Sequence, residues 1–117
     1  MIDINIQKSK VHDLVSDVVI DGHANYAKYG EDIVCAAVST LMFTLIGSLD
    51  EVLKLDTKKY TYNINEDQVN ISLNIDIKAL TENERHDVRL LTSMFLTGIR
   101  GAIQDYDKYA KITIREV

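Results

Sequence analysis

Residues 69–77 read VNISLNIDI, and they show the clearest alternation of apolar and polar side chains in the chain. Every odd-numbered position in this stretch carries valine, isoleucine or leucine, and every even-numbered position carries a polar residue. Because successive side chains of a strand point to opposite faces, the pattern predicts a strand with one buried face and one wet face. A sheet built from such strands is covered on one side only.

Four further strands are predicted, three before this stretch and one after it. The second of them is rich in valine and apolar on both faces, which favours a central place in the sheet. Polar residues after two of the strands indicate turns. In chain order the segments are a strand at 2–6, a turn at 8–10, a strand at 11–21, a strand at 60–64, a turn at 65–67, and a last strand at Ile112 and Ile114.

Residues 82–105 have helical spacing, with apolar side chains at three- and four-residue steps. Thr81 and Glu84 fit a capping box at the start of this helix. Gly98 and Gly101 each cost about 1 kcal/mol relative to alanine, so we expect close packing against the other helix or the sheet at both. The apolar stripe consists of Val88, Leu91, Phe95, Ile99, Ala102 and Tyr106.

Residues 33–55 form the other predicted helix, which is apolar on most sides over its first half. Such a helix needs cover from the sheet and from a further surface, which favours a partner chain. The resulting order β-β-α-β-β-α-β predicts an α+β fold with a mainly antiparallel sheet and two helices. A chain of 117 residues has the usual length of one domain, so residues 1–117 are expected to form a single domain.

Composition excludes several classes of protein. The net charge of −5 argues against direct nucleic-acid binding, which requires basic patches. A single cysteine cannot form an internal disulfide, and the N-terminal residues lack the apolar core of a signal peptide. The richest apolar stretch, Ile33 to Ile46, is 14 residues long, whereas a membrane span needs about 20. We therefore expect a soluble cytoplasmic protein without a membrane partner.

The candidate chemistry lies in residues 21–39, DGHANYAKYGEDIVCAAVS, where Cys35 follows His23 by twelve positions. If the helix begins after Asp32, that aspartate is the N-cap and Cys35 is the third helical residue. The unpaired N–H groups and the positive dipole of a helix start stabilise a thiolate. Cys35 is equally interpretable as a small buried hydrophobe ahead of two alanines and a valine.

His23 would stand at the end of a strand, joined to the helix by a loop at 24–31 that contains Asn25, Tyr26, Tyr29 and Gly30. A short loop between rigid elements holds their ends near each other, so imidazole and thiol could meet. Ser39 shares the helical face of Cys35, and its hydroxyl is expected to bond either the histidine or substrate, or its own helix backbone.

No metal site or cofactor is expected. His12 is predicted to lie in a strand, and His86 beside Asp87 on a solvated helix start, and neither has a second ligand at metal-binding spacing. The GIRG sequence at 98–101 lies inside a helix and is not a phosphate-binding loop.

Residues 22–41, GHANYAKYGEDIVCAAVSTL, closely resemble the signature of the bacterial ribosomal-processing cysteine protease family, Prp. The matching positions are Gly-His-Ala at 22–24, Gly30, and Asp-Ile-Val-Cys-Ala-Ala-Val-Ser at 32–39. The resemblance implies a catalytic dyad of His23 and Cys35, a homodimer, and a loop at 24–31 that is mobile until substrate orders it. It also implies the substrate, which is the N-terminal extension of a large-subunit ribosomal protein, the twenty-seventh, made as a longer precursor.

In the mechanism that this resemblance suggests, the thiolate forms a thioester, and N–H groups at the helix start, including that of Cys35, are candidates to stabilise the oxyanion. Gly22 leaves room for peptide backbone beside the histidine. Tyr26 and Tyr29 could line the substrate groove or anchor the loop, and Asp32 could orient His23. The alternative function is non-enzymatic: a dimeric ribosome-associated binding or assembly factor in which Cys35 only packs helix against sheet.

Overall fold

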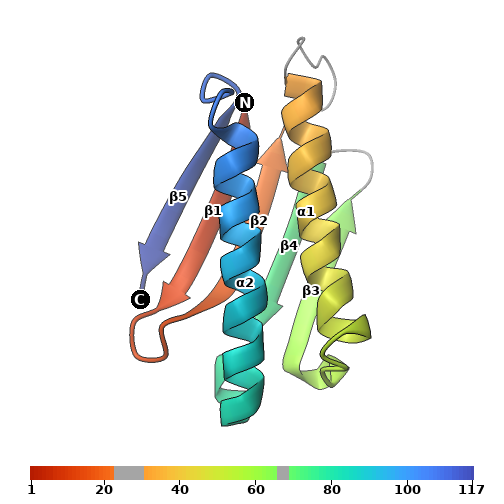
Figure 1. Cartoon of the computed structure of the whole chain (residues 1–117), viewed down its shortest axis with the longest axis vertical. Helices are drawn as coiled ribbons and strands as arrows, with labels where there is room; N and C mark the ends of the chain where they lie inside the picture. The colour runs from red at the N-terminus through yellow and green to blue at the C-terminus, as the bar shows by residue number, and fades with distance from the viewer. Residues whose placement is uncertain (23–30, 66–68) are drawn as a thin grey trace.

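The computed structural model describes residues 1–22, 31–65 and 69–117, and its elements follow the predicted order β-β-α-β-β-α-β (Figure 1). Two short 3-10 turns, η1 (Thr57–Lys59) and η2 (Ile77–Ala79), precede β3 and α2. The strands and helices are β1 (Ile2–Ser9), β2 (Leu14–Gly22), α1 (Glu31–Glu51), β3 (Tyr60–Asn65), β4 (Val69–Ile75), α2 (Glu82–Ile103) and β5 (Ala110–Glu116).

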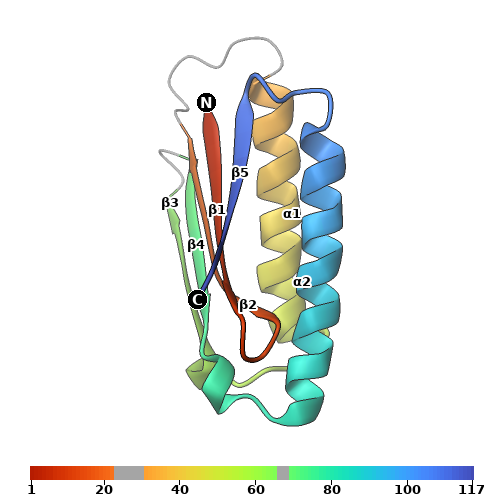
Figure 2. The ribbon, with the colours of Figure 1, turned by 90° about the vertical axis from the view of Figure 1, so that its left-hand side faces the viewer.

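The five strands form one sheet in the order β3-β4-β2-β1-β5. All neighbouring pairs are antiparallel except β1 and β5, which run parallel, so the predicted mainly antiparallel sheet is confirmed. The valine-rich strand β2 lies at the centre, as its two apolar faces predicted. Figure 2 shows both helices on the same face of the sheet, which leaves the other face uncovered.

The core forms between that covered face and the helices. Ile20 of β2 lies between Ile4 of β1 and Ile71 of β4 in the strand pairing, and all three side chains are buried. Along β4, Ile71, Leu73 and Ile75 are buried whereas Asn74 is exposed. The period of two in the sequence therefore gives the two faces that it predicted.

Helix α2 buries its predicted stripe at Val88, Phe95 and Ile99. Its capping box is confirmed: the Thr81 hydroxyl accepts the Glu84 N–H at 3.2 Å, and Glu84 Oε1 accepts the Thr81 N–H at 2.9 Å. Lys59 Nζ also donates to Glu84 Oε1, at 2.7 Å. Thr81 and Glu84, three positions apart, thus fix where the helix begins, together with the more distant Lys59.

The Glu84 carboxylate should contribute stability that depends on pH. The hydrogen bond from Lys59, followed by that from the Thr81 N–H, holds the pKa of Glu84 below its usual value of 4.5. A lowered folded-state pKa means that the stabilisation is present above the unfolded-state pKa and is lost as pH falls through the folded-state pKa. We expect Glu84→Gln to reduce the free energy of unfolding by about 0.5–1 kcal/mol at neutral pH, because both side chains of the ion pair are partly exposed.

Urea unfolding of both proteins across the acidic range measures this effect. The difference between the wild type and Glu84→Gln should shrink towards zero at the acid end. The matched control is Glu82→Gln, in the same helical turn but exposed and, among the described residues, without an ion pair. A penalty for Glu84→Gln that is independent of pH, or no larger than that for Glu82→Gln, would contradict the expectation.

The two glycines of α2 differ in their surroundings. A Cβ atom built on Gly98 would lie 2.9 Å from Leu41 Cδ2 of α1, so the predicted close packing is confirmed there. At Gly101 a Cβ atom would meet nothing within 4 Å, so the same prediction is wrong at this position. Gly101 is exposed near the end of the helix, where no other element of the described chain approaches it.

Gly101→Ala should therefore stabilise the protein by about 0.5–1 kcal/mol, because alanine restricts the unfolded chain and fits the helix without a clash. Gly98→Ala should give a smaller gain, since the end of the Leu41 side chain must move. Urea unfolding of the two variants measures the difference. An equal or larger gain for Gly98→Ala would show that the contact with Leu41 has no energetic consequence.

Several predicted boundaries are wrong. Strand β1 continues to Ser9, so the turn falls at 10–13, contains His12, and places Asp13 in the left-handed region at φ 48°. His12 therefore does not lie in a strand. Strand β4 ends at Ile75 and α2 ends at Ile103, and each end lies two residues before the predicted one.

Helix α1 ends at Glu51 rather than near residue 55. Lys54 adopts φ 51°, and the Leu55 N–H returns to the Leu49 carbonyl at 2.9 Å, which closes the helix. Ile33–Glu51 is long and apolar enough to cross a membrane by length and composition, contrary to the shorter stretch considered above, but the core helix of a soluble protein meets the same criteria. The side chains that α1 buries in the core are Val34, Val38, Met42, Leu45, Ile46 and Leu49.

Candidate active site

The end of β2 and the start of α1 lie at the same end of the molecule (Figures 1 and 2). Gly22 is the last residue of β2; it is buried and pairs with Val69 of β4. The chain resumes in the described part at Glu31, the first residue of α1. Helix α1 packs along α2 and over β4, so strand end and helix start are held by the same core.

Four of the predicted site residues, His23, Tyr26, Tyr29 and Gly30, lie outside the described residues, as do the side chains of Glu31 and Asp32. The structure therefore places Gly22, Cys35 and Ser39, together with the backbone of Asp32. The pairing of His23 with Cys35 stays a prediction.

Cys35 occupies the second turn of α1 and is partly exposed. Its neighbours Val34 and Val38 are fully buried, and Cys35 itself packs against the edge of the same core. Ser39, one turn later, is also half-buried, whereas Ala36 and Thr40 are exposed. Cys35 and Ser39 thus share a stripe at the boundary between core and solvent, where a side chain can both pack and be reached.

The helix begins earlier than predicted, at Glu31, so Asp32 is the second helical residue and not the N-cap. Cys35 is the fifth residue, not the third. In an α-helix the first four N–H groups have no partner within the helix, and later ones bond to the carbonyl four residues back. The N–H of Cys35 is therefore engaged with the helix, and any oxyanion donors at this end come from earlier positions.

Ser39 differs from the other hydroxyl residues of α1. Thr40 Oγ1 donates to the Ala36 carbonyl and Thr44 Oγ1 to the Thr40 carbonyl, both at 2.8 Å. Within the described residues, the Ser39 hydroxyl makes no such bond to its own helix. The bond of Ser39 to His23 or to substrate, the other interpretation open from the sequence, stays a prediction, because His23 lies outside the described residues.

Two carboxylates lie beside the end of β2. Asp21 precedes Gly22 and lies opposite Asp3 of β1 in the strand pairing, and both are exposed. Like charges facing each other across a sheet destabilise it slightly, and Lys111 of β5, which lies opposite Asp3 in the parallel pairing, places a positive charge beside them.

Among the described residues, no group of three or more histidine, cysteine, aspartate or glutamate side chains could hold a metal ion. His12 lies in the β1–β2 turn, and His86 on α2 contacts only its neighbour Asp87, at 3.3 Å. These two histidines contribute nothing to the end of the molecule that carries Cys35.

Sequence comparison places the chain close to known proteases. Residues 1–111 match the family described as Cysteine protease Prp. A ribosomal processing cysteine protease Prp from Staphylococcus aureus is 26% identical over 101 residues, which cover 86% of this chain and 88% of the relative. The protein of the same name from Bacillus subtilis is 26% identical over 113 residues, covering 97% of this chain and 96% of the relative.

Solved structures share the fold. The crystal structure of an essential ribosomal processing protease Prp from S. aureus, in complex with a substrate peptide, superposes with a TM-score of 0.79. It is 20% identical and covers 98% of this chain and 100% of its own. The crystal structure of a Streptococcus mutans protein gives a TM-score of 0.82 at 27% identity, over 100% of this chain and 96% of its own.

Proposed function

Because the chain belongs to the family of the cysteine protease Prp, we propose that it is the endopeptidase that removes the N-terminal extension of a large-subunit ribosomal protein, the twenty-seventh. The observation that carries this proposal is the family match over residues 1–111, which spans every described part of the site. The partly exposed position of Cys35, at the end of the molecule where β2 stops, supports it. Relatives named for ribosomal processing supply the substrate class.

In the proposed mechanism Cys35 and His23 form a dyad. The imidazole takes the thiol proton, and Sγ attacks the carbonyl carbon of the scissile bond to give a tetrahedral intermediate. This intermediate collapses to a thioester as the C–N bond breaks, and the imidazolium gives its proton to the leaving amine. His23 then takes a proton from water, whose oxygen attacks the thioester, and the proton returns to sulfur as the acid leaves.

Supporting roles follow from position. N–H groups that precede Cys35 at the helix start are the proposed oxyanion donors, and one such donor is worth about 3–4 kcal/mol in known enzymes. Ser39, whose hydroxyl is not committed to its helix in the described structure, is proposed to bond His23 or the substrate. Tyr26, Tyr29 and Gly30 are proposed to form the wall of the groove, and Asp32 to act on His23 by charge.

Charge favours a basic substrate. Asp21 precedes Gly22, and the net charge of −5 gives the chain as a whole a negative potential. A peptide rich in lysine and arginine, such as the N-terminal region of a ribosomal protein, would be drawn to this potential and bound less tightly at high salt.

A homodimer in the cytoplasm completes the proposal. Helix α1 leaves Ile33 and Phe43 each 47% exposed, and a second copy of the chain would cover such a face.

The test incubates the protein with the unprocessed precursor and follows the N-terminus of the product by mass spectrometry. Shortening of the precursor at a single bond supports the peptidase. The rival function, a dimeric ribosome-associated binding or assembly factor, predicts a stable complex with an intact precursor. Binding without cleavage, by a folded protein with a reduced cysteine, would therefore favour the binding factor.

A further inference from the structure

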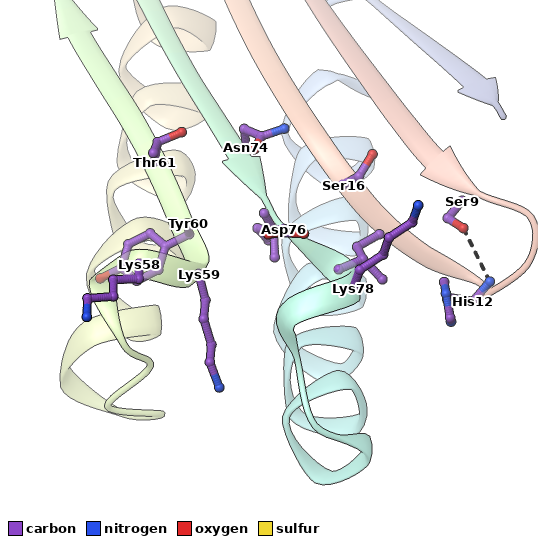
Figure 3. A pocket seen from close by; sticks show the side chains of 12 residues that line it. Ser9, His12, Ser16, Lys58, Lys59, Tyr60, Thr61, Asn74, Asp76 and Lys78 are labelled. Atoms are coloured by element: carbon purple, nitrogen blue, oxygen red, sulfur yellow. Dashed lines mark hydrogen bonds between the residues drawn. The ribbon is translucent and has the colours of Figure 1, made fainter.

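A concave site, seen from close by in Figure 3, lies at the end of the molecule that carries the β1–β2 turn, opposite to the end where α1 begins (Figure 1). It has a volume of about 490 Å³ and forms where the β1–β2 turn, the start of β3 and the end of β4 converge. The buried side chains of Tyr60, Ile75 and Ile77 supply its floor. These side chains belong to the core, so the part of the site that they line is formed without a ligand.

Three lysines line this site, Lys58, Lys59 and Lys78. Lys59 is neutralised by Glu84, at 2.7 Å. Lys58 and Lys78 are exposed and, among the described residues, neither has a carboxylate within ion-pair distance. One acidic side chain, Asp76, also lines the site, so its formal charge is positive on a chain whose net charge is negative.

The nearby carboxylate of Asp17 does not compete for these lysines. It accepts hydrogen bonds from Asn74 at 2.7 Å, from Ser16 at 2.8 Å and from Gln7 at 3.3 Å. Three donors therefore already satisfy Asp17, and two of them, Ser16 and Asn74, line the cavity.

Hydrogen-bond donors converge beside Lys78. Figure 3 shows its side chain extending from η2 towards Ser9, the last residue of β1, and His12 lies in the turn that follows. Ser9 Oγ accepts the His12 N–H at 3.3 Å, so the hydroxyl hydrogen of Ser9 can still be donated. An ammonium, a hydroxyl and an imidazole on one side of a cavity, with Thr61 and Lys58 on the other, suit a ligand with several negatively charged oxygen atoms.

We infer that this site binds the phosphate group of a small phosphate ester. A phosphate monoester carries a charge of about −1.5 to −2 at neutral pH, and Lys78, which lacks a carboxylate partner among the described residues, extends its positive charge towards Ser9. A long polyanion such as RNA fits less well, because it must approach a protein of net charge −5. The site is remote from Cys35, so the inference stands or falls independently of the proposed peptidase.

The test titrates isotope-labelled protein with inorganic phosphate and, separately, with adenosine 5′-monophosphate, and follows amide NMR shifts at constant ionic strength. We expect saturable shifts at Ser9, His12 and Lys78 with both ligands. Tighter binding of the nucleotide would show that the ester group also contacts the site, and equal binding would show that phosphate alone is recognised.

Lys78→Gln should weaken binding about tenfold, since it removes the unit charge next to the anion. The matched control is Lys111→Gln, an exposed lysine on β5 outside the site, which should leave the affinity unchanged. The inference is overturned by shifts that do not saturate, by equal weakening in both variants, or by binding of an RNA oligomer when neither small ligand binds.

Discussion

Cys35→Ala is expected to abolish cleavage of the ribosomal precursor, with a loss of at least about a thousandfold in rate, because the nucleophile of the proposed mechanism is gone. The fold should survive. Cys35 is only partly buried at the edge of the core, so its truncation should cost about 1 kcal/mol or less in free energy of unfolding. Mass spectrometry of the precursor, with circular dichroism of the variant, measures both effects.

His23→Ala should give a loss of similar size, because residues that act as a unit do not contribute additively. It should also raise the pH midpoint for alkylation of Cys35, since an adjacent imidazolium favours the thiolate. The matched control is Thr40→Ala. Thr40 is exposed, lies one position after Ser39, and donates its hydroxyl hydrogen to the Ala36 carbonyl of the same helix. Cleavage that persists in folded Cys35→Ala or His23→Ala protein would contradict the proposed catalytic dyad.

The strands and the second helix were predictable because their signals are local. An alternation of period two, as at 69–77, specifies both a strand and the face that it buries. The capping box of Thr81 and Glu84 fixes the start of α2 within its own four residues. The central place of β2 agrees with its valine-rich sequence, although Val19 on the face without helices is exposed.

Boundaries failed where backbone geometry, rather than side-chain pattern, decides them. The pairing of β1 with β2 shifts register between Gln7 and Lys8, and Asp13 takes a left-handed conformation in the turn that follows. Lys54, also left-handed, closes α1 four residues before its apolar pattern ends. Glycine is the residue that usually indicates a left-handed conformation in a sequence, and neither position carries glycine.

Local sequence patterns predict one part of the candidate site and not the other. Cys35 and Ser39 share a helical face by their spacing alone, and the structure gives them the same half-buried boundary. The start of α1 at Glu31 could not be read from the sequence, because Asp32 offered a good N-cap two positions too late. The lysine-lined cavity could not be predicted from the sequence, because Lys58, Lys78 and His12 come from three separate segments that meet only in the fold.

Phe95→Ala is expected to destabilise the protein by about 3–5 kcal/mol, through lost burial and the cavity that remains. Phe95 is 4% exposed and lies beside Leu41 and Leu45, so it joins the two helices above the sheet. Because whole domains are stable by only about 5–15 kcal/mol, one such change can leave much of the protein unfolded at physiological temperature. Urea unfolding measures the loss.

The neighbouring residue provides the control. Met94 is 71% exposed, so Met94→Ala should change the free energy of unfolding by no more than about 0.5 kcal/mol. Precursor cleavage by Phe95→Ala protein should fall only in proportion to the unfolded fraction, since Phe95 lies in the core and Cys35 at its edge. A penalty for Phe95→Ala no larger than that for Met94→Ala would mean that α2 is not held to α1 and the sheet by its apolar stripe. The packing that sets the start of α1 beside the end of β2 would then need another source.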